Sequence, residues 1–193
     1  MLQIKVARLT ALTLTIIGAA ALTSCGGSTA PTPAAEPQAS APVAPKAQDT
    51  GSQTMSAEEA QVLREVNAAR AVPRTCGDVA YAAAAPVAWN GFLAVAARAH
   101  TADMAARNYF AHISPEGGTL VTRAEAAGYT TWRELGENIA AGYTVQNVVQ
   151  GWIDSPGHCK NLMDPKFKEM GAGYTYRTGS TFGTYWAQEF GTR

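Results

Sequence analysis

The segment Trp152-Ile153-Asp154-Ser155-Pro156-Gly157-His158-Cys159 decides how the C-terminal half of this chain folds. An apolar helical pattern runs up to Trp152, and the turn residues Ser155-Pro156-Gly157 end it. His158 therefore follows a rigid break, where a side chain can face a cleft instead of being buried on a helix face.

The three histidines of the chain give the best clue to function. His112, like His158, lies in a short segment bounded by turn residues, and Glu137 lies between them in Gly136-Glu137-Asn138. Two neutral imidazoles, one carboxylate and a water make an acceptable zinc shell, so these three residues are a candidate site for a divalent cation such as zinc. Two other readings stay open: a hydrogen-bonded His-Glu-His network without an ion, and Glu137 as a solvent-facing flank.

The third histidine, His100, falls on the apolar stripe of a predicted helix between Asn90 and Asn108. A histidine on such a face is usually a hydrogen-bonded core residue. We therefore expect His100 to be structural and leave it out of the site.

Along the domain, apolar residues first recur at helical spacing and then, near the C-terminus, at strand spacing. Ser56-Ala57-Glu58-Glu59 is a capping box that predicts a helix over 57–71. The other predicted elements are a helix from Asn90 to Asn108, a short helix over 120–127, a helix from Thr144 to the break at Ser155, and a hairpin of 170–176 with 182–190. Helices ahead of a short antiparallel sheet predict an α+β domain.

The cysteines indicate an oxidising compartment. If Cys25 is modified by lipid, Cys76 and Cys159 remain as an even pair, which favours a disulfide. In the chain-entropy model, closing a loop of roughly eighty residues would stabilise the fold by at most about 4–5 kcal/mol. The alternative is a free Cys159 nucleophile activated by a histidine.

The first 24 residues have the form of a signal peptide. Lys5 and Arg8 make a basic start, 9–22 is an apolar stretch too short for a confident membrane span, and Leu22-Thr23-Ser24-Cys25 resembles a lipobox. The resemblance to bacterial lipoproteins predicts that an acylated Cys25 anchors the protein in a membrane. Because no Asp follows Cys25, it favours the outer membrane over the inner one. An ordinary secretory signal with an unmodified Cys25 remains the alternative.

Residues 25–56 are expected to be the lipidated cysteine followed by a disordered Pro/Ala-rich stalk. The segment is poor in large apolar side chains, and at about 3.1 Å per residue it could hold a domain up to roughly 90 Å from the bilayer. Residues 57–193 have the length and apolar content of one domain. The 15 basic and 15 acidic residues balance, no basic stripe is present, and nucleic acid is not an expected partner.

Taken in order, the segments of 57–193 resemble bacterial members of the CAP superfamily, also called SCP-like extracellular proteins. The segments that carry the resemblance are Asn67-Ala68-Ala69-Arg70, Trp89-Asn90, His100-Thr101-Ala102-Asp103-Met104, Tyr109-Phe110-Ala111-His112, Gly136-Glu137-Asn138-Ile139-Ala140, 152–158, Met170-Gly171-Ala172-Gly173-Tyr174 and Trp186-Ala187-Gln188-Glu189-Phe190. The resemblance implies a three-layer α-β-α sandwich, with about four helices around a mainly antiparallel sheet and a central cleft.

In that family the cleft is lined by two histidines and usually two acidic residues, and His112, Glu137 and His158 match three of these positions. The fourth position, a glutamate in many members, aligns with Ser155, which leaves a more neutral site. Asp154 or Glu189 could supply the missing charge.

Two classes of function follow. The favoured one is a tethered extracytoplasmic binding module whose cleft accepts a lipid, peptide or glycan. The other is a metal-dependent hydrolase in which Glu137 is the general base for a water held by His112 and His158. Ser114 or Ser155 as a nucleophile has less support, because neither lies in a Gly-x-Ser-x-Gly elbow.

Overall fold

A computed structural model of the chain describes residues 54–193. The predicted signal peptide, the predicted lipidation site at Cys25 and almost all of the predicted stalk lie outside these residues. No helix among residues 54–193 is long and apolar enough to cross a bilayer.

The first helix begins where the capping box predicts. In α1 (Ala57–Arg70) the Ser56 side chain accepts a hydrogen bond from the Glu59 N–H, and the Glu59 carboxylate accepts one from the Ser56 N–H. At its other end, the fully buried Arg70 donates to the carbonyls of Ala85, Leu162, Asp164 and Phe167. A cation therefore ties the end of α1 to Ala85, to the end of the last helix and to the chain that follows that helix.

The next two helices also begin at residues whose side chains cap them. Asn90 accepts from the N–H groups of Phe92 and Leu93 at the start of α2 (Gly91–Arg107), and α2 ends at Asn108 in the left-handed conformation. Thr119 caps α3 (Leu120–Ala126). Both helices match their predictions to within one residue.

The prediction of about four helices is one short, because the break after Trp152 separates two helices. The first, α4 (Val148–Asp154), begins four residues after Thr144, the predicted cap. The second, α5 (Pro156–Met163), has Pro156 in its first turn. Proline needs no hydrogen-bond partner for its nitrogen at a helix start, so Ser155-Pro156 ends one helix and begins the next. His158 lies in the first turn of α5, not in a loop.

The sheet is mainly antiparallel, as predicted. Its strand order is β3 (Ala88–Trp89), β5 (Glu169–Tyr176), β6 (Thr184–Thr192) and β4 (Glu134–Ala141). The predicted hairpin is β5 with β6, and only the short β3 pairs in parallel. A separate two-stranded ribbon, β1 (Arg74–Cys76) with β2 (Val79–Tyr81), was not predicted.

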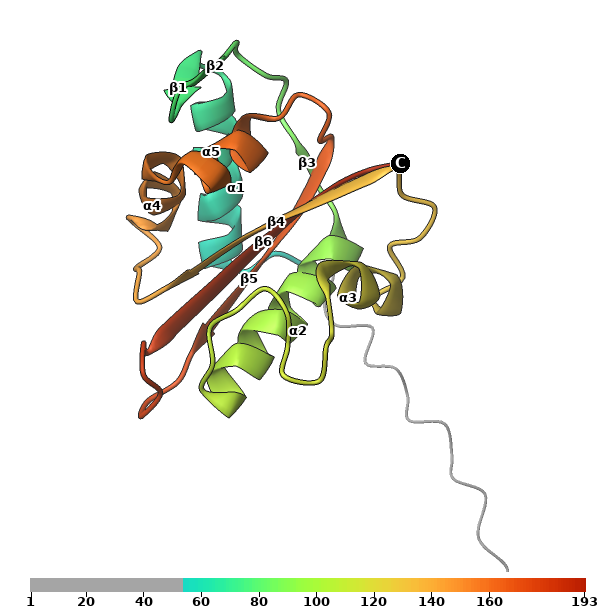
Figure 1. Ribbon diagram of the computed structural model, residues 1–193, viewed down its shortest axis with the longest axis vertical. Helices are drawn as coiled ribbons and strands as arrows, with labels where there is room; N and C mark the ends of the chain where they lie inside the picture. Colours follow the sequence, from blue (N-terminus) through green and yellow to red (C-terminus); the bar gives the residue numbers. More distant parts are fainter. Residues whose placement is uncertain (1–53) are drawn as a thin grey trace, which may run out of the picture. The chain divides into compact units, whose positions relative to one another are not determined.

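Helices cover both faces of the sheet, which confirms the α+β class and the three layers (Figure 1). One face packs against α1, α4 and α5, with Val62, Trp152, Leu162 and Trp186 in its core. The other face packs against α2 and α3, with Ala97, Met104, Ile139 and Tyr185 in the core. The approach of α2 is so close that a Cβ at Gly171 would overlap the backbone of Ala94.

Candidate functional site

Glu137 and His112 meet at the site that the sequence predicts. Glu137 is in the middle of β4 and is 7% exposed, so it is not a solvent-facing flank. The Nδ1 atom of His112, in the turn after α2, lies 2.6 Å from Glu137 Oε1. A carboxylate can only accept, so the Nδ1–H of His112 donates to Glu137.

Arg123 of α3 completes this cluster and was missed by the sequence reasoning. Its guanidinium donates to Glu137 Oε2 at 2.5 Å and to the carbonyls of His112 and Gly118 at 3.2 Å each. Arg123 thus holds the His112 turn through its backbone, while Glu137 holds the His112 ring. A signal was present in the sequence, because Arg123 lies three residues after Leu120 and next to Ala124, at the helical spacing of the apolar face.

Two more buried groups lie next to Glu137. His100 is buried, as predicted for a structural residue, but its Nε2 is 3.8 Å from Glu137 Oε2, so it adjoins the site. Glu189 faces Glu137 directly across β4 and β6 and is fully buried. Its Oε1 lies 3.8 Å from Arg123 Nε. In the described part of the chain, neither Glu189 oxygen has a hydrogen-bond partner.

These surroundings shift the pKa values of the two carboxyl groups in opposite directions. Burial alone would raise the pKa of Glu137, but the hydrogen bond from His112 and the charge of Arg123 bring it below its ordinary value. Burial raises the pKa of Glu189 well above its ordinary value, the charge of Glu137 adds to the rise, and Arg123 opposes it. Glu137 is therefore the ionised member of the pair at neutral pH.

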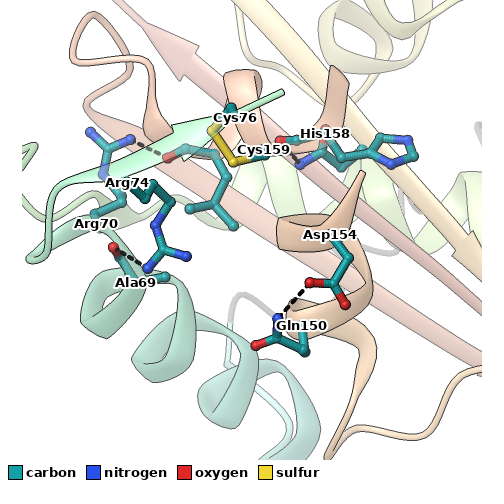
Figure 2. Close-up of a disulfide and its surroundings, with 10 residues drawn as sticks. Ala69, Arg70, Arg74, Cys76, Gln150, Asp154, His158 and Cys159 are labelled. Carbon is teal, nitrogen blue, oxygen red and sulfur yellow. Dashed lines mark hydrogen bonds between the residues drawn. A yellow bond between two sulfur atoms is a disulfide. The ribbon is translucent and has the colours of Figure 1, made fainter. Parts of the chain in front are cut away.

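The predicted disulfide is confirmed and lies beside His158. Cys76 and Cys159 are bonded, with their Cα atoms 5.4 Å apart, so Cys159 is not a free nucleophile. Asn138, the neighbour of Glu137, donates to the carbonyl of His158 at 3.1 Å. Figure 2 shows the His158 ring pointing away from the disulfide. The backbone of His158 is thus fixed from two sides while its side chain stays available.

His158 lines a groove of about 220 Å³. Three consecutive residues of β4, Ile139, Ala140 and Ala141, line one part of it. Its walls are Phe110 and Tyr143 together with Gly151, Trp152, Ser155 and His158. Burial lowers the pKa of His158, and the charge of nearby His112 lowers it further, so its imidazole is neutral at physiological pH. Within residues 54–193, that imidazole has no hydrogen bond to another side chain.

The donor set fits a metal ion poorly at Glu137. Both of its oxygens are engaged, one by His112 and the other by Arg123, and the guanidinium supplies the positive charge that a metal would bring. Among the described residues, no three His, Cys, Asp or Glu side chains are grouped so that they could hold an ion. The metal site of His112, Glu137 and His158 stays a prediction, and nothing below depends on it.

The sequence also suggested Asp154, Glu189, Ser155 and Ser114 as site residues, and the structure gives each of them a different role. Asp154 accepts from Gln150 Nε2 at 2.7 Å on α4 (Figure 2), and of the two residues considered for the missing charge only Glu189 adjoins Glu137. Ser155 lines the groove, as its alignment with the fourth family position implies. Ser114 Oγ accepts from the Gly118 N–H, which gives that serine a role in the turn.

Similar proteins share both the sequence pattern and the fold. YkwD of Bacillus subtilis strain 168, described as uncharacterized, is 37% identical over 106 residues, covering 54% of this chain and 39% of that protein. An extracellular protein containing an SCP domain from Bacillus anthracis has a TM-score of 0.58 at 29% identity, over 70% of this chain and 40% of that one. A cysteine-rich secretory protein of Staphylococcus aureus, with a TM-score of 0.51 at 17% identity over 70% of this chain and 38% of that one, supports the fold alone.

The matches span less than half the length of these three relatives. The family assignment depends on a longer match, because residues 63–190 fit the model of the cysteine-rich secretory protein family, CAP. That stretch includes His112, Glu137 and His158, and it covers most of the described fold. The chain therefore belongs to the CAP family of cysteine-rich secretory proteins.

Proposed function

We propose that this protein is a membrane-tethered extracytoplasmic binding module whose ligand enters the groove beside His158. The observation that carries the proposal is the pairing of an apolar groove with one unengaged imidazole. Phe110, Tyr143 and Trp152 supply the apolar surface, and His158 supplies a hydrogen-bond donor and acceptor at one wall. Binding sites commonly combine a mostly apolar lining with a few placed polar groups.

The cluster of His112, Glu137 and Arg123 supports the groove. Glu137 and Asn138 directly precede Ile139 in β4, and the Asn138 amide donates to the carbonyl of His158. Asn161 of α5 also donates to the Glu137 carbonyl at 3.1 Å and to Asn138 Oδ1 at 3.1 Å. These bonds couple the strand that carries Glu137 to α5, so they preorganise the wall that presents His158.

The hydrolase alternative has less support. A general base needs an oxygen that can take a proton from water, whereas both Glu137 oxygens are engaged and the pKa of Glu137 is lowered. The hydrogen bonds from His112 and Arg123 hold the Glu137 carboxylate in place, so it is not available as a base.

The tether and the location follow from the N-terminal sequence. An acylated Cys25 would hold the domain at a membrane, with the segment after it as a spacer. The predicted signal peptide, the disulfide and the membership of a secretory family support an extracytoplasmic location. The residue after Cys25 favours the outer membrane.

The test is to block the groove. Ser155 lines it and makes no side-chain cap bond to α5, so Ser155→Phe fills the groove without removing a cap. Asp154→Phe adds the same ring one residue earlier, outside the groove lining, and is the matched control. The full-length proteins are purified from the cells that produce them, and their bound molecules are identified by mass spectrometry.

We expect one class of molecule to be retained by the wild type and by Asp154→Phe, and to be lost from Ser155→Phe. Equal retention by all three proteins, or retention by none, would overturn the proposal.

A further inference from the structure

The strand that lines part of the groove is an edge of the sheet. Among the described strands, β4 has β6 as its sheet neighbour on one side and no strand on the other. An edge strand leaves every second residue with its N–H and C=O pointing away from the sheet. Such groups are costly to bury without partners, so it matters which residues carry them.

The hydrogen bonds of β6 identify those residues. The carbonyls of Gly183 and Gly191 accept from Arg177 and Lys168, next to β5, whereas those of Thr184 and Thr192 accept from Gly142 and Arg133, next to β4. In a central strand, successive residues bond alternately to its two neighbours. Even-numbered residues of β6 therefore bond to β4.

The register then assigns the residues of β4. Ala140 is paired with Trp186 and Asn138 with Gln188, so the even-numbered residues of β4 face β6. Glu137, Ile139 and Ala141 point their backbone groups outward. The Glu137 carbonyl accepts from Asn161, which confirms the direction and satisfies that group. Ile139, which is 4% exposed, and the half-buried Ala141 direct their N–H and C=O groups away from β6, toward the side where no described strand lies.

The groove meets β4 at this edge and not on one of its faces. The side chain of Ile139 packs in the layer of α2, while that of Ala140 packs in the layer of α1 and α5. Side chains that point to opposite layers can border one groove only where the groove runs along the backbone between them.

We propose that the ligand of this groove is an extended peptide that adds as a strand along β4 at Ile139 and Ala141. The inference rests on the proposed binding function and names its ligand class. Two backbone N–H groups and two C=O groups, two residues apart, match the spacing of another extended backbone. An acyl chain would cover these groups without bonding to them, at a cost in free energy.

The walls indicate which peptides fit. Alternate side chains of an added strand point to opposite sides. Phe110 contacts Phe182, which packs on Tyr185 in the layer of α2, whereas Trp152 belongs to the layer of α1 and α5, so each side of the strand meets an aromatic residue of the lining. The lining is mainly apolar, and His158 adds a neutral polar group. Apolar side chains at alternate positions are therefore favoured.

The first experiment selects binders from a random octapeptide library on immobilised full-length protein, with Ser155→Phe as the counter-selection. A selected peptide is then resynthesised with one backbone N-methyl group at each position in turn. Peptide residues that pair with Ile139 and Ala141 lose their bond on methylation, while the residue between them does not. We expect alternating losses of at least about tenfold in affinity at two positions separated by one.

The second experiment changes the protein. Proline is tolerated at an edge strand where its N–H faces outward, so Ala141→Pro should keep the ladder to β6 and weaken peptide binding at least about tenfold. Ala140→Pro removes a ladder bond instead and should lower the melting temperature.

Three results would overturn the inference: no peptide enriched over Ser155→Phe, losses without alternation in the methyl scan, or unchanged binding by a folded Ala141→Pro. If mass spectrometry finds a lipid or glycan that Ser155→Phe loses, the binding function stands and the peptide inference fails. If Ser155→Phe loses nothing, both fail.

Discussion

Glu137 and Glu189 are direct cross-strand partners in β4 and β6, both are buried, and both adjoin the guanidinium of Arg123. Glu137 has hydrogen bonds to both oxygens, whereas the Glu189 oxygens have none among the described residues. Two carboxylates share one cation, so the better-bonded one is ionised and the other is kept neutral. This difference in ionisation between Glu137 and Glu189 leads to predictions that can be measured.

Glu189→Gln should stabilise the protein at neutral and alkaline pH. In the unfolded chain a glutamate ionises near pH 4.3, while burial raises the pKa of Glu189 in the folded protein. Its contribution to the free energy of unfolding is therefore full at low pH and falls as the pH rises. Removing the ionisable group should raise the free energy of unfolding by about 1 kcal/mol or more at pH 8.

Urea unfolding at pH 5 and pH 8 measures this effect, with Asp78→Asn, an exposed acid-to-amide change, as the control. The gain should be larger at pH 8. The same loss of stability at both pH values would show that Glu189 is needed as a carboxylate.

The contribution of His100 to the free energy of unfolding should have the opposite pH dependence. Burial lowers the pKa of His100 to about 4, and the charge of Glu137 only partly opposes the shift. Below pH 6.5 the unfolded state binds a proton that the folded state refuses, so the contribution of His100 is present above pH 6.5 and is lost as the pH falls toward 4. The loss should be on the order of 3 kcal/mol.

His100→Leu should flatten this slope when compared in the Glu189→Gln background, which removes the opposing effect. Chemical unfolding at several pH values between 4.5 and 7 measures it. If both histidine and leucine proteins lose stability equally on acidification, His100 is not the group responsible.

Arg123 and Glu137 should be strongly coupled. Arg123→Met leaves a buried carboxylate whose one remaining side-chain hydrogen bond among the described residues is from His112, and breaking a buried pair from one side should cost about 3 kcal/mol or more. Glu137→Gln in the same protein removes the stranded charge. The double variant should therefore be more stable, by over about 1 kcal/mol, than the sum of the single losses predicts. Additive losses in a urea double-mutant cycle would mean that the two side chains act independently.

Membrane attachment tests the N-terminal prediction. Cys25→Ser removes the acylation site and should move the protein from the membrane to the soluble fraction, with the same melting temperature for its domain. Fractionation of producing cells followed by immunoblotting makes the measurement. Persistent membrane fractionation of the serine protein would point to another anchor.

Local sequence signals predicted most of the fold. Ser56, Asn90 and the turn between 176 and 182 set element boundaries through bonds between near neighbours, which a sequence pattern records directly. The disulfide followed from cysteine number and compartment. The second helix at Pro156 was missed because Ser-Pro fits both the end of one helix and the start of another.

The site was predicted less completely because its contacts are long-range. Arg123 comes from α3, Glu189 from the last strand, and Glu137 from β4, and only the sheet register and helix packing bring them together. Likewise, the outward direction of Ile139 and Ala141 depends on the pairing of β4 with β6. A linear pattern marks Glu137 and the histidines, but it does not contain that register.

The central claim is that the binding groove runs along an unpaired strand edge, and amide hydrogen exchange of the full-length protein tests it most directly. By NMR at neutral pH, the amides of Ile139 and Ala141 should exchange much faster than that of Ala140, which bonds to β6, and they should slow when a selected peptide is added. Equally slow exchange at all three residues in the free protein would show that the edge is already covered, and would contradict the account.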